Sequence, residues 1–159
     1  MKQGKNSYVL FFVISTAVFL LDQITKYLIR SHLRLAEVIT VFSFFSVVYV
    51  DNTGSAFGML KSLGNPFFIS VAAAAIIVIA VMIVKARENR LALSLILGGA
   101  AGNLADRIVH GYVVDFLDFS AGGHHWPAFN IADSALTVGI TLLVIDMVFR
   151  RSERGRPVT

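Results

Sequence analysis

Carboxylates inside or beside apolar segments are the residues of this chain best suited to chemistry. Asp115 stands in the run Val113-Val114-Asp115-Phe116-Leu117, where the adjacent residues supply no positive charge. Apolar surroundings disfavour the ionised form and raise the pKa of a carboxyl group, and a second carboxylate nearby raises it further. Asp115 is therefore a candidate for a carboxylic acid that stays protonated near neutral pH. Asp118 is the competing candidate, and the local sequence does not separate the two.

The pattern Asn-x-x-Asp occurs twice, at Asn103–Asp106 and at Asn130–Asp133. In the second copy Asn130 is suited to be a helix N-cap, with Asp133 at the third helical position. The helix dipole and free N–H groups favour a carboxylate there. A plain capping motif and a functional site explain this copy equally well, because the helix is apolar enough to lie in a membrane. The first copy ends its helix, where a structural network of Asp106 with Arg107 is favoured.

Two further patterns predict contacts of helices. Asp22 and Lys26 are four residues apart and share one helix face. An ion pair that anchors the helix end is favoured over a positioned charge at a site, because the lysine satisfies the aspartate locally. Gly98 and Gly102 have GxxxG spacing, which is typical of close helix packing in membranes.

Other chemistries are disfavoured. The chain has no cysteine, which excludes disulfides, Cys-ligated zinc, iron–sulfur clusters and a thiol nucleophile. His124-His125 has no accompanying metal-binding pattern. Gly54-Ser55-Ala56-Phe57-Gly58 is not GxSxG and has no general base beside it. We therefore expect no metal, no cofactor and no serine nucleophile.

The elements that position these residues are apolar stretches of membrane-spanning length. The 159 residues are 56% hydrophobic and only 15% charged, with a mean hydropathy of +0.73, which indicates one membrane domain over residues 1–159. The third of these apolar stretches has an uncharged part, Leu91–Ala105, that would be only about 22 Å long as a helix. The hydrocarbon layer of a membrane is roughly 30 Å thick. The polar end of this third stretch must therefore enter or approach the membrane, and the first and fourth stretches face the same constraint. The predicted spans are residues 8–27, 66–84, 91–108 and 131–149.

Lysine and arginine positions predict the orientation. The positive-inside rule assigns the richer side to the cytoplasm. Both termini are then cytoplasmic, and the polar residues gather near the outer leaflet. The formal charge of +4 and pI of about 9.7 report this topology, and nucleic-acid binding is not expected because no soluble face interleaves aromatic and basic residues. The two sides carry Lys2, Lys5, Lys85, Arg87, Arg90, Arg150, Arg151, Arg154 and Arg156 against Arg30, Arg34 and Lys61.

Two outer connections remain, at about residues 29–65 and 109–130. In the first, Val38–Val50 is rich in Val, Phe and Ile and predicts β-structure, followed by a turn at Asp51–Gly54. Ser55–Leu63 is a candidate for a short amphipathic helix on the membrane. In the second, His110-Gly111 predicts a helix end before the extended segment Tyr112–Phe119.

Five segments together resemble the bacterial lipoprotein signal peptidase family, the type II signal peptidases. They occur in that family's order and spacing between about Leu21 and Ile145, nearly the whole chain. Each alone is a weak signal, but the set is highly specific. The segments are Asp22-Gln23-x-x-Lys26, Asn52-x-Gly54-x-Ala56-Phe57, Gly99-x-x-Gly102-Asn103-x-x-Asp106-Arg107, Val113-Val114-Asp115-Phe116 and Phe129-Asn130-x-Ala132-Asp133-Ser134.

This resemblance implies an integral-membrane aspartic endopeptidase. Its substrates would be prolipoproteins whose lipobox cysteine carries a diacylglyceryl group, cut just before that cysteine, and globomycin would be an inhibitor. The implied fold has four transmembrane helices, an extracytoplasmic β-cradle and a short outer helix. We expect a monomer in the bacterial inner membrane, in contact with its lipids. The catalytic pair falls on Asp115 and Asp133. The matching supporting residues are Asp22, Lys26, Asn52, Gly54, Gly99, Asn103, Arg107 and Asn130.

Physical chemistry supplies an expected mechanism for such a pair. Two close carboxylates cannot both ionise cheaply, so they hold one proton between them. The ionised member takes a proton from a water that attacks the scissile carbonyl, and the protonated member donates to the carbonyl oxygen. Asp133, at a helix N-terminus, is the expected base.

Two other classes of function compete with the peptidase. A proton-coupled transporter or channel would use membrane carboxylates as a relay. The carboxylates here gather at one surface, however, and leave no polar path to the other. A membrane scaffold held by the GxxxG face explains neither Asp115 nor Asp133.

Overall fold

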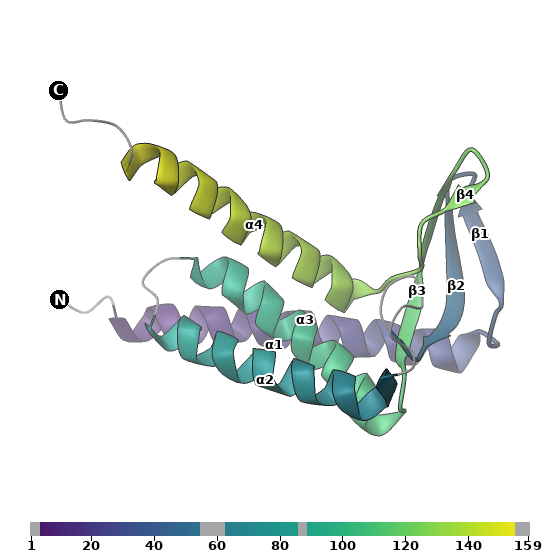
Figure 1. Cartoon of the computed structure of the whole chain (residues 1–159). Helices are drawn as coiled ribbons and strands as arrows, with labels where there is room; N and C mark the ends of the chain where they lie inside the picture. Colours follow the sequence, from purple (N-terminus) through teal and green to yellow (C-terminus); the bar gives the residue numbers. More distant parts are fainter. Residues whose placement is uncertain (1–3, 55–62, 86–88, 155–159) are drawn as a thin grey trace.

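A computed structural model describes residues 4–54, 63–85 and 89–154 of the chain, with side chains described for residues 9–54, 63–85 and 89–149. The helices form a bundle, and a small sheet stands across one end of it, which we call the sheet end (Figure 1). Helix α1 begins and α4 ends at the opposite, far end (Figure 1). The elements are α1 (Gly4–His32), β1 (Val38–Phe42), β2 (Phe45–Asn52), α2 (Gly64–Lys85), α3 (Arg90–Val109), β3 (Val113–Ala121), β4 (His124–His125) and α4 (Ile131–Arg154).

All four helices are long and apolar enough to cross a membrane, which confirms the four predicted spans. Each helix continues beyond one or both predicted ends, because polar residues at a bundle end can remain helical outside the hydrocarbon. The structure is mainly helical with one small antiparallel sheet, as predicted.

Small residues let α3 pack closely against its neighbours. A Cβ added at Gly98 would lie 2.6 Å from the carbonyl oxygen of Ser15 in α1. A Cβ added at Gly99 would lie 2.5 Å from the carbonyl oxygen of Ala132 in α4. Both distances are too short for a side chain, so the backbones approach as the GxxxG pattern predicts. Helix α3 thereby brings its polar sheet end against α1 and α4.

The sheet is antiparallel with strand order β1-β2-β3-β4. The predicted β-segment Val38–Val50 is two strands, and the second continues to Asn52. Two residues of the predicted Asp51–Gly54 turn therefore belong to β2. The side chain of Asn52 makes the turn, because its Oδ1 accepts a hydrogen bond of 3.0 Å from the Gly54 N–H. In the register of β2 with β3, Val50 is opposite Asp115 and Asn52 is opposite Val113.

The two faces of β3 have different neighbours. Val114 and Phe116 pack with Ile29 of α1 and Tyr49 of β2 in a buried apolar cluster. Because alternate residues of a strand point to opposite faces, Asp115 is directed away from this cluster and toward the ends of α3 and α4. The apolar cluster thus anchors the strand that carries the candidate acid.

The predicted end of the third helix and the predicted extended segment after it are both observed. His110 is the C-cap of α3, and Gly111 adopts the left-handed backbone conformation at φ +82°, which confirms the predicted helix end. The predicted extended segment after it is β3, one residue later at its start than expected. The amphipathic helix predicted for Ser55–Leu63 falls, apart from its last residue, outside the described residues.

Candidate active site

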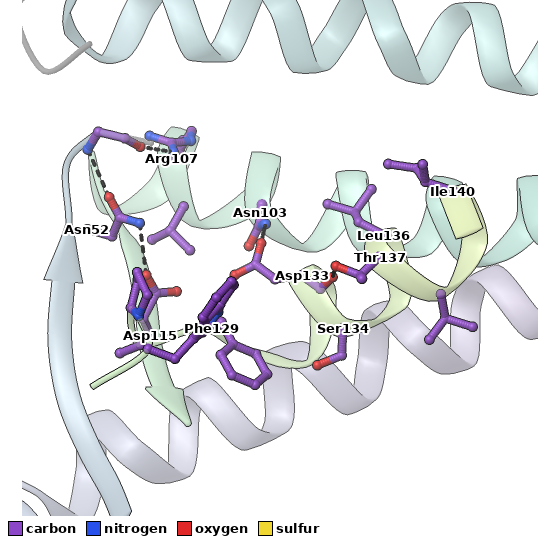
Figure 2. Close-up of a pocket in the computed structure, with 16 residues that line it drawn as sticks. Asn52, Asn103, Arg107, Asp115, Phe129, Asp133, Ser134, Leu136, Thr137 and Ile140 are labelled. Carbon is purple, nitrogen blue, oxygen red and sulfur yellow. Dashed lines mark hydrogen bonds between the residues drawn. The ribbon is translucent and has the colours of Figure 1, made fainter. Parts of the chain in front are cut away.

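Asp115 and Asp133 line one cavity of about 690 Å³ at the sheet end of the bundle. Asp115 comes from β3 and Asp133 from the first turn of α4. Figure 2 shows Asp133 beside Asn103 of α3 and Asp115 joined to Asn52 of β2. The cavity is also bordered by apolar residues of α4, among them Leu136 and Ile140 (Figure 2). Two carboxyl groups far apart in sequence therefore face one space.

Asp115 is almost completely buried, with 2% of its surface exposed. Asn52 Nδ2 donates to its Oδ2 at 2.8 Å, and Asn130 Nδ2 donates to its Oδ1 at 2.7 Å. Burial and the negative charge of Asp133 raise the pKa of Asp115 to about 7, although the two amide donors oppose the rise. The prediction that Asp115 is a carboxyl group with a raised pKa is therefore confirmed.

Asp133 is held by the capping interactions of α4. Its N–H donates to Asn130 Oδ1 at 2.9 Å, and its Oδ2 accepts from the Asn130 N–H at 3.3 Å. This reciprocal pair is a capping box, which confirms Asn130 as the predicted N-cap. Asn103 Nδ2 adds a hydrogen bond of 2.8 Å to Asp133 Oδ1. The carboxylate thus accepts from two elements at the positive end of a helix dipole.

Asn130 connects the two aspartates through a single side chain. Its Nδ2 contacts the Asp115 carboxyl group, and its Oδ1 accepts from the Asp133 N–H. The same Nδ2 lies 3.2 Å from the carbonyl oxygen of Val114. Since Asn130 is completely buried, few other arrangements of this amide are open to it. Asn130 thus fixes β3, which carries Asp115, relative to α4, which carries Asp133.

The predicted ion pair of Asp22 with Lys26 is confirmed at 2.8 Å, with both side chains fully buried. Lys26 also lies 3.1 Å from Asp106 and donates to Asn103 Oδ1 at 3.0 Å. It therefore belongs to a larger network and is not a snorkelling anchor at the helix end.

The structural network predicted at Asp106 is present, but its arginine is Arg30 and not Arg107. Asp106 forms its ion pairs with α1, through Lys26 and, at 3.7 Å, Arg30. Arg107 Nη2 instead donates to the carbonyl oxygen of Gly54 at 2.7 Å, and its guanidinium lies 4.5 Å from the ring centre of Phe68. Consecutive helical residues point about 100° apart, so Asp106 and Arg107 meet different neighbours.

Asp118 is not brought to the cavity. Its carboxylate lies 2.9 Å from His125 Nδ1 near the β3–β4 turn, where His125 is exposed. An odd separation of three residues turns the two aspartates of β3 to opposite faces. The structure thus separates the candidates that the local sequence left open.

The remaining supporting residues lie around the two aspartates. Asn52, Gly54, Asn103 and Arg107 line the cavity, and Gly99 lies against α4. Gln23 belongs to the first of the five motif segments, but it was not predicted as a residue of the site. Its Nε2 lies 3.2 Å from Asp22 Oδ2, 3.1 Å from the carbonyl oxygen of Gly102 and 3.3 Å from Asp106 Oδ1. The signal that could have predicted this role was the position of Gln23, a polar amide next to Asp22 in a mostly apolar span.

A metal centre finds no support in the described part of the chain. Among those residues, no group of three or more His, Asp or Glu side chains is placed to hold a metal ion. The polar side chains that line the cavity are two carboxyl groups, the amides of Asn52 and Asn103, the guanidinium of Arg107 and the hydroxyls of Ser134 and Thr137.

Comparison with known proteins places the chain in a family. The sequence profile described as signal peptidase (SPase) II matches residues 14–149. The chain belongs to the signal peptidase II family. It is therefore a peptidase of the aspartic class, and the transporter and scaffold alternatives do not apply.

Full-length relatives support this family membership. The lipoprotein signal peptidase of Thermodesulfovibrio yellowstonii is 46% identical over 127 residues, which are 80% of this chain and 86% of the relative. That of Syntrophus aciditrophicus is 43% identical over 162 residues, covering 95% of this chain and 99% of the relative. A solved structure described as a bacterial membrane enzyme is 31% identical and superposes with a TM-score of 0.85, covering 98% of this chain and 96% of that one. The similarity to lipoprotein signal peptidases thus extends over nearly the whole chain.

Proposed function

We propose that this chain removes signal peptides from prolipoproteins whose cysteine carries a diacylglyceryl group, with Asp115 and Asp133 as its catalytic pair. The names of its relatives support the prolipoprotein as substrate. The observation that carries the catalytic assignment is the placement of two buried carboxyl groups on one cavity, linked by the amide of Asn130. An aspartic mechanism requires two such groups close enough to share a proton.

The surroundings of the pair favour Asp115 as the acid and Asp133 as the base. With a pKa of about 7, Asp115 is protonated in about half of the molecules at neutral pH and in most of them at lower pH. Asp133 accepts hydrogen bonds from Asn103 and from the Asn130 N–H at a helix N-terminus, and these donors stabilise a carboxylate. The pair therefore carries one proton and one negative charge.

Hydrolysis then proceeds without a covalent intermediate. Asp133 takes a proton from a water molecule in the cavity, and the hydroxide oxygen bonds to the scissile carbonyl carbon. Asp115 donates its proton to the carbonyl oxygen, which gives a neutral tetrahedral intermediate. In its collapse, the proton held by Asp133 passes to the leaving nitrogen as the C–N bond breaks, and a hydroxyl proton returns to Asp115. The products are the signal peptide and the lipid-bearing cysteine with a free amino group.

The position of the cavity supports recognition of the lipid. Its border includes Val138 and Ile140 of α4, which are about half exposed on the surface of a predicted span. Trp126, also exposed, borders it on the sheet side. A cavity edged by lipid-facing residues can admit acyl chains sideways from the bilayer. Phe57, which ends the motif segment that begins at Asn52, lies outside the described residues.

A substrate comparison tests the lipid requirement. The diacylglyceryl-modified precursor and the same peptide with an unmodified cysteine are incubated with the protein in the same detergent. We expect turnover of the modified form and little or none of the unmodified one. Equal rates would contradict lipid recognition.

We further propose that the protein lies in the cytoplasmic membrane as a monomer, with both termini in the cytoplasm and the sheet end at the outer leaflet. The lysine and arginine distribution supports this orientation. Single cysteines at His124 and Lys85 test it, since the chain has no native cysteine. An impermeant thiol reagent added to whole spheroplasts should label the first and not the second, and the reverse pattern would overturn the orientation.

The catalytic assignment is tested with the lipid-modified precursor and three matched variants. Asp115→Asn and Asp133→Asn keep the size of each side chain but remove its acid–base chemistry, so each should abolish measurable cleavage while the protein still inserts. Asp118→Asn makes the same change on the other face of β3 and should stay active. Substantial activity in Asp115→Asn or Asp133→Asn would refute the catalytic pair.

A further inference from the structure

Three fully buried charged residues lie next to the cavity but take no part in the proposed chemistry. Lys26 stands between Asp22, at 2.8 Å, and Asp106, at 3.1 Å, and all three side chains have no exposed surface. Burying such charges is costly even when they are paired. Apolar side chains could join α1 to α3 without this cost. Further hydrogen bonds of the two carboxylates give the network a second role.

Each of the two carboxylates accepts a hydrogen bond from the main chain next to a catalytic aspartate. Asp22 Oδ1 accepts from the Ala132 N–H at 2.9 Å, one residue before Asp133. Asp106 Oδ2 accepts from the Val114 N–H at 3.1 Å, one residue before Asp115. Hydrogen bonds to an ionised acceptor are stronger than neutral ones, so they restrain both backbone positions.

Lys26 also controls a side chain at the cavity. Its Nζ donates to Asn103 Oδ1, which leaves Asn103 Nδ2 to face Asp133 Oδ1 at 2.8 Å. An ammonium group can only donate, so it fixes which end of the Asn103 amide points toward the aspartate. The network thus reaches Asp133 by two routes, through its backbone neighbour and through its hydrogen-bond partner.

We propose that Asp22, Lys26 and Asp106 form a clamp that sets the separation and orientation of Asp115 and Asp133, with Asp106 as a positioning residue for the reaction. This inference rests on the proposed catalytic pair. The clamp joins α1 and α3 to β3 on one arm and to α4 on the other. Its action is mechanical, because the three residues hold the main chain and leave the cavity itself to the aspartates.

Neighbouring residues are arranged to keep the clamp in place. Gln23 Nε2 contacts both carboxylates, Asp22 at 3.2 Å and Asp106 at 3.3 Å. A Cβ at Gly102 would collide with Asp22 Oδ2, so the absence of a side chain makes room for that arm. Gln23 of α1 therefore holds both carboxylates, and Gly102 of α3 leaves space for that of Asp22.

The variant Asp106→Asn tests the clamp with a matched control. It keeps the side-chain size but removes the charge that holds Lys26 and the Val114 N–H. A displacement of the reacting groups by about 1 Å costs up to about 100-fold in rate, so we expect kcat on the lipid-modified precursor to fall about 10- to 100-fold. The KM should change less than about threefold, because the lipid-facing part of the cavity is untouched. Asp146→Asn makes the same change in a carboxylate at the far end and should keep kcat within about twofold.

A purely structural ion pair predicts a different result. The folded fraction, measured by thermal unfolding of the purified protein, would then account for the whole loss of rate. That outcome, or a native kcat in Asp106→Asn, overturns the clamp. If Asp106→Asn does not fold, Gln23→Leu removes one brace without changing the charge and should lower kcat about two- to tenfold, the equivalent of one hydrogen bond. An unchanged kcat there would then overturn the proposal.

The same experiment separates the clamp from the catalytic assignment. Activity in Asp115→Asn and Asp133→Asn would refute the catalytic pair itself. If those two variants are inactive and a folded Asp106→Asn behaves as native, the pair stands and the clamp alone is refuted.

Discussion

Helices α3 and α4 are joined at both ends by the same kind of hydrogen bond, from an asparagine amide to an aspartate. At the sheet end Asn103 Nδ2 donates to Asp133 Oδ1 at 2.8 Å, and at the far end Asn89 Nδ2 donates to Asp146 Oδ2 at 2.8 Å. The surroundings differ. At the sheet end the bonded pair shares its cavity with a second carboxyl group, Asp115. At the far end the other residues that border the local cavity are apolar, namely Leu91, Ala92, Leu142, Ile145 and Phe149.

This contrast shows what an active site needs beyond a hydrogen bond that joins two helices. An amide–carboxylate bond stabilises either end, and by itself it supplies no acid. Chemistry needs a second carboxyl group whose pKa is raised, and groups that hold the pair in register. The sheet end has both, because β3 and the loop before α4 bring Asp115 and Asn130 onto the end of α3.

The largest expected difference between the two ends is in catalysis. Asp133→Asn should abolish measurable cleavage, because it removes a general base whose contribution is at least about 10²- to 10⁴-fold in rate. Asp146→Asn should leave the rate within about twofold. Initial rates on the lipid-modified precursor, with thermal unfolding as a check of folding, make the comparison. Equal losses in the two variants would mean that both aspartates act structurally.

A smaller difference is expected for two glycines of the helix interface. Gly102→Ala forces a Cβ against the Asp22 carboxylate, and Gly139→Ala places one 2.6 Å from Ile96 Cγ1 and 2.8 Å from the Ala92 carbonyl oxygen. Each should cost about 1–3 kcal/mol of stability, because neither helix can move away freely. Only Gly102→Ala should also lower kcat, by about tenfold if the displaced carboxylate no longer holds Ala132.

The measurements for this pair are the unfolding midpoint and kcat of each folded variant. A Gly139→Ala protein with the larger loss of kcat would contradict the contrast between the two ends.

The pH dependence gives a moderate effect with a defined sign. Asp115 must be protonated to act as the acid, so the rate should fall as the pH rises through its pKa of about 7. The Asn52 amide lowers the pKa of Asp115 by stabilising the ionised form. In Asn52→Ala the alkaline limb of the rate profile should therefore move to higher pH, by up to about one unit, while the maximum rate also falls.

Asn89→Ala is the control for this profile, since it removes an aspartate's amide partner at the far end. It should leave the alkaline limb in place. A limb that moves to lower pH in Asn52→Ala would contradict the assignment of Asp115 as the acid.

The smallest effect is expected on the outer face of β3. Asp118→Asn removes the pairing with His125, most of which is exposed. Exposed ion pairs contribute about 0–1 kcal/mol, so stability should change by less than that, and the rate should stay within about twofold. A loss as large as that of Asp115→Asn would reverse the choice between the two aspartates of β3.

Features set by local sequence could be predicted from the residues themselves, whereas most individual long-range contacts could not. The pairing of Asp115 with Asp133 was expected only from the family resemblance. The span lengths, the Asn130 cap and the Asp22–Lys26 pair depend on residues at most a few positions apart or on continuous apolar stretches. The partners of Asp106 lie on α1 and β3, and adjacency in sequence wrongly favoured Arg107. Similarly, only the register of β3 against the bundle decides that Asp115 and not Asp118 faces Asp133.

The central claim is that Asp115 and Asp133 share one proton, and infrared spectroscopy of the carboxylic C=O stretch measures this most directly. Spectra of the purified protein are recorded from about pH 5 to about pH 9, around the range where a raised carboxyl pKa is expected. The account predicts a carboxyl group that ionises near pH 7 in the native protein, is absent in Asp115→Asn, and ionises at lower pH in Asp133→Asn because the neighbouring negative charge is gone. A band that persists in Asp115→Asn, or that ionises at the native pH in Asp133→Asn, would contradict it.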